Sequence, residues 1–245
     1  SGTIGFRMNT TKAAVDETIT VNGATIVVRI AAPDPAGTNT FGFFVQDLSL
    51  KVGDFVSLEG NVAFTQSGGR TVFGGEGLEL FMGQGPARLA NGGRNPDAVG
   101  VVLTDATVGL IKEGNTYALY ARGTLQLLGV DGLEVLGVVE IRFNNTGKAF
   151  KGTDGTGLGI EIPGTDRTVK VLFADASRVA EFSGDVTFKV ADVLELAGRV
   201  AFQPAPDRSV KVSITGGSVK IKVNGDEAFR ISGDLTFSLG GLDGF

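Results

Sequence analysis

A long segment of this sequence occurs twice, with the same internal spacing in both copies. Residues 48–64 align without a gap to residues 186–202, and the shared glycines, Gly60 and Gly198, lie 138 positions apart. The identical residues of the first copy are Lys51, Val52, Asp54, Leu58, Gly60, Val62, Ala63 and Phe64. A repeat of this kind predicts a structural unit that is used more than once, in which each unit covers apolar surface of its neighbour.

A second match has a nearly equal offset. Residues 7–15 resemble residues 142–150, with Arg7 and Arg142 separated by 135 positions. We therefore divide the chain into one unit at residues 1–141 and a second, shorter unit at residues 142–245 that ends inside a repeat. The period exceeds the roughly 20–50 residues of the familiar solenoids. This length leaves two architectures open, an elongated sandwich of serial meanders or one sheet rolled along an axis.

The secondary-structure signal is alternation of apolar and polar residues. Residues 209–214 and 218–223 both place Val or Ile at every second position, as half-buried strands do. Gly216-Gly217, Asn224-Gly225 and Asp131-Gly132 are typical of two-residue hairpin turns, because such turns need positive φ. The sequence predicts an all-β fold, an antiparallel meander of long hairpins built from internal tandem repeats.

Composition limits the possible partners. The chain is 42% hydrophobic and 20% charged, enough to bury a sizeable core, and its 38 glycines against 7 prolines suit many turns. A net charge of −5 argues against nucleic acid and against anionic membrane surfaces as partners. Charged or polar residues interrupt every long apolar run, so we expect no transmembrane segment.

Histidine and cysteine are both absent. Their absence excludes Ser-His-Asp triads, Cys-His pairs, disulfides and thiolate or imidazole metal sites. A hydrolase with paired carboxylates is the enzyme class that stays open, but the chain has no Trp and only Tyr117 and Tyr120 to surround a sugar. We expect a protein that is not an enzyme.

Three aspartates fall at matching turns of the hairpin copies: Asp54, Asp131 and Asp192. A short carboxylate in a turn accepts backbone N–H groups and tolerates left-handed φ, so we interpret these residues as turn residues. Calcium binding is the alternative, with Asp185 and Asp234 as further candidate ligands, because calcium needs several converging oxygens. We expect no resident cofactor other than this possible calcium.

Residues 83–94 form a glycine-rich connection that carries Arg88 and Arg94. Two arginines beside glycines could cradle an anion, but no Lys-Ser or Lys-Thr pair follows as in a phosphate-binding loop. We interpret the segment as an exposed loop between strands. The two arginines are our candidates for contacts with a surface or protein ligand.

Glycine-punctuated, acidic, cysteine-free units of this length resemble the repeat regions of large bacterial surface or secreted proteins, the adhesin-like and RTX-like group. The resemblance covers the whole chain and implies an extracellular or cell-surface location, with calcium often stiffening the repeats. Residues 152–159 are the nearest approach to the glycine- and aspartate-rich nonapeptide of the RTX group, and they occur once.

The expected function is therefore that of a non-enzymatic spacer, stalk or adhesive segment, with neighbouring repeats of the same protein as its partners. One alternative is a barrel-like module that binds an apolar or carbohydrate ligand. The carboxylate-type hydrolase is the second alternative.

Overall fold

The computed structural model describes residues 2–30, 32, 36–52, 56–163, 165, 167–204 and 210–239. These residues form strands and connecting turns and contain no helix, and therefore none that could cross a membrane. The strands are β1 (Thr3–Asn9), β2 (Val15–Val21), β3 (Ala24–Ile30), β4 (Thr40–Val52), β5 (Val56–Ser67), β6 (Arg70–Gln84), β7 (Val99–Glu113), β8 (Thr116–Leu128), β9 (Leu133–Asn144), β10 (Leu158–Glu161), β11 (Thr168–Val171), β12 (Val179–Val190), β13 (Leu194–Pro204), β14 (Val210–Val223) and β15 (Asp226–Leu239).

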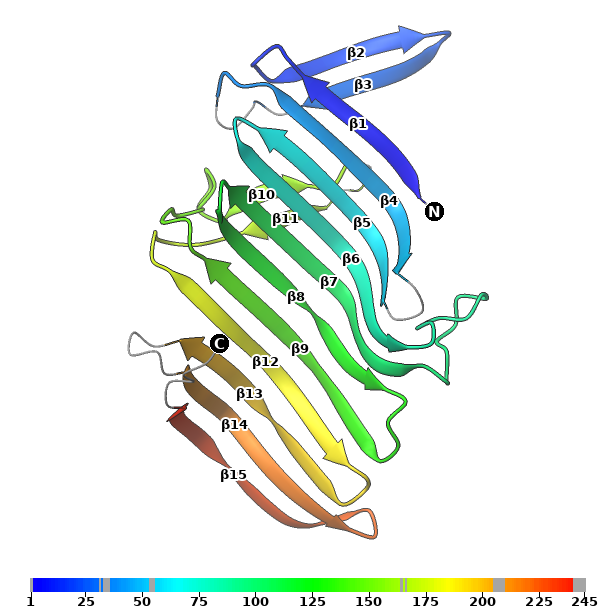
Figure 1. Cartoon of the computed structure of the whole chain (residues 1–245), viewed down its shortest axis with the longest axis vertical. Helices are drawn as coiled ribbons and strands as arrows, with labels where there is room; N and C mark the ends of the chain where they lie inside the picture. The colour runs from blue at the N-terminus through cyan, green and yellow to red at the C-terminus, as the bar shows by residue number, and fades with distance from the viewer. Residues whose placement is uncertain are drawn as a thin grey trace.

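Eleven strands form one antiparallel sheet in the order β1-β4-β5-β6-β7-β8-β9-β12-β13-β14-β15. Each pairs with the next sheet strand along the chain, and two small hairpins, β2–β3 and β10–β11, interrupt the meander (Figure 1). The predicted all-β antiparallel meander of long hairpins is confirmed. It is built as one continuous curved sheet.

The turns follow the sequence prediction at some places and not at others. Asn224 and Gly225 connect β14 to β15 with φ values of 52° and 88°, as a hairpin turn of two positive-φ residues requires. The predicted turn at Gly216-Gly217 is wrong, because β14 runs through it from Val210 to Val223. Gly216 has a φ of 60° and lies at a β-bulge, where the pairing with β15 shifts between Ile214 and Gly217.

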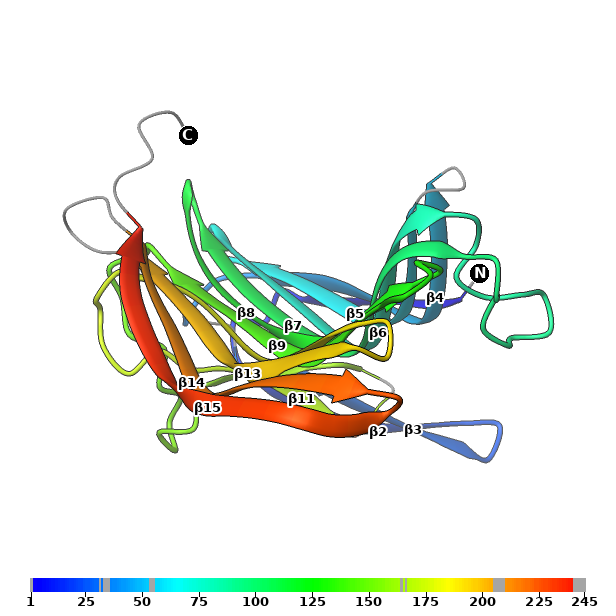
Figure 2. The same ribbon diagram turned by 90° about the horizontal axis from the view of Figure 1, so that it is seen from below.

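A series of bulges bends the sheet. Positive φ values mark Asp47 (52°), Gly60 (131°), Gly77 (60°), Asp105 (50°) and Gly216 (60°), and the strand register shifts beside each of them. A bulge bends its strand and increases its local twist. Because neighbouring strands bend in the same sense, the sheet forms a trough with a concave and a convex face (Figure 2).

The hairpin β10–β11 covers part of the convex face, over β6, β7 and β8 (Figure 1). Two glycines allow this close approach. A Cβ at Gly74 would lie 2.7 Å from Ile160 Cγ2, and one at Gly109 would lie 2.4 Å from Val171 Cγ2. The resulting cluster contains the largest group of buried apolar side chains: Ala63, Ile111, Ala118, Phe150, Ile160, Ile162, Val169, Val171 and Phe173.

The concave face has a smaller apolar cluster at the floor of the trough, on β5, β6 and β7. Val62, Leu78 and Ala106 are buried there, at 6%, 4% and 1% exposure. Leu78 follows the bulge at Gly77 and pairs with Ala106. The bend therefore brings the side chains on the concave face of these strands into contact with one another.

Candidate binding surface

Of the described aspartates proposed as calcium ligands, two lie in hairpin turns and two lie within strands. Asp131 is exposed in the β8–β9 turn and Asp192 in the β12–β13 turn. These two turns are neighbours, since Ala191 N donates to Gly132 O at 2.6 Å. The predicted turn location is confirmed for both residues, and Asp54 lies outside the described residues.

The other two candidates have partners within the protein. Asp185 lies on β12 and pairs with Arg199 at 3.5 Å, and Asp234 on β15 accepts a hydrogen bond from Gly216 N at 2.7 Å. Among the residues described by the structure, no group of three or more His, Cys, Asp or Glu residues is placed to hold a metal ion. The structure therefore does not bring the four described candidates together at one point.

The glycine-rich segment at residues 152–159 forms a loop that leads into the first two residues of β10. The Asp154 carboxylate accepts hydrogen bonds from Thr156 N at 2.9 Å and from Thr156 Oγ1, and Lys170 lies 3.5 Å away. The bonds from Thr156 lower the pKa of Asp154 to about 2. This carboxylate closes its own loop and pairs with a cation of the protein.

Arg88 and Arg94 both bind Glu79, a residue that we did not select from the sequence. Arg88 donates to the Glu79 oxygens at 3.0 and 2.6 Å, and Arg94 donates to them at 2.9 and 3.1 Å. Burial raises the pKa of Glu79, but the hydrogen bonds and charges of the two arginines outweigh it, and the pKa lies below its usual value. The arginines hold their loop on β6.

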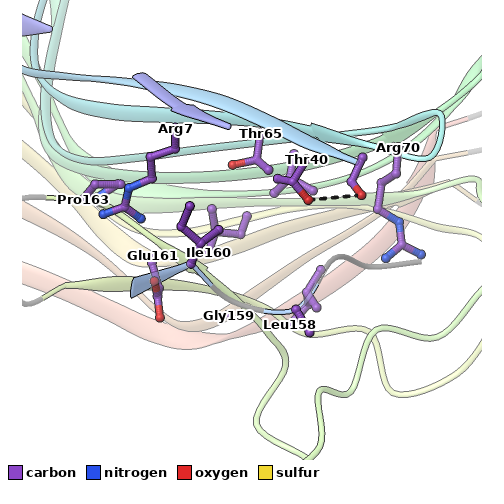
Figure 3. Close-up of a pocket in the computed structure, with 13 residues that line it drawn as sticks. Arg7, Thr40, Thr65, Arg70, Leu158, Gly159, Ile160, Glu161 and Pro163 are labelled. Atoms are coloured by element: carbon purple, nitrogen blue, oxygen red, sulfur yellow. Dashed lines mark hydrogen bonds between the residues drawn. The ribbon is translucent and has the colours of Figure 1, made fainter. Parts of the chain in front are cut away.

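A pocket of about 230 Å³ lies on the convex side, between β10 and the strands β1, β4, β5 and β6. Figure 3 shows Arg7 beside Pro163 and Glu161 at one end and Arg70 at the other. Arg70 is bound to Glu113 at 2.7 Å. Ligand pockets commonly measure about 300–1,000 Å³, so this space is small for an organic ligand.

The concave face is the larger candidate surface. A folded chain of this mass exposes about 10,300 Å² by the usual scaling, whereas this one exposes 14726 Å². Large apolar side chains account for part of the excess at both ends of the trough, on β1 and on β15. The most exposed are Ile4 at 60%, Phe6 at 72%, Met8 at 70%, Phe229 at 50%, Ile231 at 58% and Leu235 at 54%.

The concave apolar face was hidden in the sequence by the bulges. Val212 and Ile214 precede the bulge of β14 and have even residue numbers, whereas Val219 and Ile221 follow it and have odd ones. The bulge restores the phase, so that all four lie on one face. The sequence signal for the shared face is the change from even-numbered to odd-numbered apolar positions across Gly216.

Comparison with known proteins does not assign this chain to a family. No protein-family model matches this chain, and neither a curated protein nor a solved structure matches it.

Proposed function

We propose that this chain is a non-enzymatic structural or adhesive segment, a spacer or stalk, of a larger extracellular bacterial protein made of tandem units. The units are those predicted from the sequence, residues 1–141 and 142–245. Their partners are neighbouring units of the same protein. The extracellular and cell-surface location follows from the resemblance to bacterial surface repeats.

The turns after β1 and β9 support the repeated unit. Asn9 Nδ2 donates to Ala13 O at 2.7 Å, and Asn9 Oδ1 accepts from Thr11 N and Oγ1. Asn144 makes the same bonds with Lys148 O, at 2.9 Å, and with Thr146 N and Oγ1. In both places a small hairpin and then a long one follow: β2–β3 and β4–β5 in the first, β10–β11 and β12–β13 in the second.

The small hairpins carry the proposal, because within the described residues only β10–β11 packs its apolar face against the large sheet. Val169 and Val171 of β11 are 1% and 0% exposed against β6–β8. The corresponding hairpin β2–β3 projects past the edge strand β1 (Figure 1), and Ile19 and Ile26, which pair on one of its faces, are 49% and 50% exposed. A preceding unit would supply β2–β3 with the surface that β6–β8 supplies to β10–β11.

The two sheet edges agree with this arrangement. In the described part of the chain, β1 pairs only with β4 and β15 only with β14. An unpaired edge strand is a template for another strand, and both edges continue the apolar concave face. Neighbouring units that pair there would lengthen the trough, which is what a spacer requires.

The test is a chimera in which residues 1–141 precede residues 7–245. This order places β2–β3 of the second copy where β10–β11 lies in the chain itself. We expect the amides of the second copy's β2–β3 to exchange with deuterium much more slowly than those of β2–β3 in the single chain, because docking adds to the free energy of opening.

A matched variant distinguishes docking of the second copy's β2–β3 hairpin from other effects of the longer chain. Replacing Ile26 by Lys in the second copy should return hairpin exchange to the rate of the single chain, because Ile26 pairs with Ile19 on the apolar face of the hairpin. Thr20→Lys, at an exposed polar position on the opposite face of β2, serves as the control. Equal exchange of β2–β3 in the chimera and in the single chain would overturn the proposal.

A further inference from the structure

The concave face over β12–β15 contains a hollow of about 490 Å³. Apolar side chains surround it: Val186, Leu196, Val200, Ile214, Ile231 and Leu235. Its volume lies within the range of about 300–1,000 Å³ that organic ligands occupy in proteins. The hollow extends across four adjacent strands, so its long direction follows the trough.

A pair of glycines creates this hollow. Gly217, just after the bulge at Gly216, pairs with Gly233 across β14 and β15. Leu78 holds the same place after the bulge at Gly77, where it pairs with Ala106 and fills the floor of the trough. The hollow therefore lies where the other half of the sheet has buried side chains.

The lining favours hydrocarbon over a polar ligand. Asp234 is the charged residue of the lining, and its Oδ1 already accepts the Gly216 N–H at 2.7 Å. A carbohydrate would need several hydrogen-bonding groups to replace its water, and an unpaired buried hydroxyl is costly. A hydrocarbon chain has no such requirement and gains from each methylene that it buries.

A second copy of the protein does not fit this hollow. The convex side of the same strands is charged, with the pairs Asp185–Arg199 and Glu195–Lys220, which would lose water against an apolar lining. Two concave faces set against each other would meet at their raised rims and leave the floor uncovered (Figure 2). A narrow apolar ligand reaches the floor.

We propose that this hollow binds one hydrocarbon chain of a free long-chain fatty acid, lying along the trough across β12–β15. The site does not depend on the spacer role, since its lining belongs to one chain. Gly233 sets its specificity, because a Cβ there has no atom within 4 Å, whereas Ala106 fills the corresponding place elsewhere in the sheet.

The experiment is titration of the full chain with a fluorescent polyene fatty acid, and we expect saturable binding of one molecule per chain. Gly233→Leu should weaken binding about tenfold or more, because several ligand methylenes lose their burial. A Cβ at Gly233 has no atom within 4 Å, so the larger side chain enters open space. Ser232→Leu, on the opposite face of β15, is the matched control and should bind like the wild type.

Ile231→Asp provides a second variant if Gly233→Leu does not fold, because Ile231 is 58% exposed and tolerates substitution. It should also lose binding. Nonsaturable binding, unchanged affinity in both hollow variants, or equal loss in Ser232→Leu would each overturn the site. So would sedimentation showing that a dimer forms in place of fatty-acid binding and that Gly233→Leu disrupts it.

Discussion

Arg94 of the β6–β7 loop donates two hydrogen bonds to Glu79 of β6, at 2.9 and 3.1 Å. The Glu79 side chain is only 10% exposed. Arg88 binds the same carboxylate from the other side of the loop. One acidic group therefore attaches the β6–β7 connection to β6 and binds both of its arginines.

Removing this carboxylate should destabilise the protein. We expect Glu79→Gln to lower the free energy of unfolding by about 2 kcal/mol, because two charge-assisted pairs to a carboxylate that is only 10% exposed are lost. Glu134→Gln is the control, since Glu134 pairs with Lys189 but its side chain is 71% exposed. The control should change stability by about 0.5 kcal/mol or less. Urea denaturation measures both, and equal small effects would refute the structural role of Glu79.

The two asparagine turns allow a test of the repeated unit. Asn144 is 0% exposed and Asn9 is 2% exposed, and each satisfies three backbone or hydroxyl groups of the next four residues. We expect Asn144→Ala to cost about 1–3 kcal/mol of unfolding free energy, because the Lys148 carbonyl and the Thr146 N–H lose the partner that this buried side chain provides. Asn9→Ala should cost less in the single chain, since β1 lies at an edge and frays more easily.

In the chimera, the second copy's Asn9→Ala should become as costly as Asn144→Ala, because its strand then has neighbours on both sides. Thermal denaturation of the single chain and the chimera, each with and without Asn9→Ala, and of the single chain with Asn144→Ala provides the comparison. If Asn9→Ala costs the same in the single chain and in the chimera, the two turns are alike only in local geometry.

Local patterns predicted the strands and several turns, whereas relations across the sheet could not be read from them. Alternation identifies residues 209–214 and 218–223 as strand segments, and it gives the same signal for two strands or for one bulged strand. The choice depends on β15, whose Gly233 and Leu235 pair on either side of the bulge. That information is distributed over residues far from Gly216.

The candidate sites show the same limit. Arg88 and Arg94 stood out because loops carry many functional residues, but their partner is a single acidic residue within an apolar strand segment. Gly217 and Gly233 offered no chemical signal, because a hollow becomes visible only when the strands around it are placed. A glycine that leaves space in the fold gives a weaker sequence signal than a charged residue in a loop.

Acid should destabilise the protein in a window set by Glu195. Its carboxylate accepts hydrogen bonds from Lys220 Nζ at 2.5 Å and Lys222 Nζ at 3.0 Å, and these lower its pKa from 4.5 to about 2. Because the folded pKa is below the unfolded one, this contribution is complete above pH 4.5 and is lost as the pH falls toward about 2.

The check is the melting temperature of wild type and Glu195→Gln between these two pH values. The difference should be largest at the upper end of the window and should close toward its lower end. A constant difference across the window would show that the substitution acts through packing and not through titration.

Calcium removal should leave the melting temperature unchanged. Asp131 and Asp192 lie in neighbouring turns, but Asp185 and Asp234 are occupied by Arg199 and Gly216, so the described residues offer no converging set of oxygens. Melting with calcium and with a chelator decides the question. A rise in melting temperature with calcium that Asp192→Asn abolishes would establish a site at the two turns.

The free edges should make the chain associate end to end as its concentration rises. Pairing of β15 with β1 of another copy would satisfy the outer backbone groups of both strands and would bury Phe6 and Ile231, which are 72% and 58% exposed. We expect Phe6→Lys to weaken association about tenfold or more, since it places a charge on the continued apolar face. Thr3→Lys adds the same charge to the opposite face of β1 and should associate like the wild type. Sedimentation velocity over a range of concentrations measures both variants, and a wild type that stays monomeric at the highest concentration would show that the edges are protected in solution.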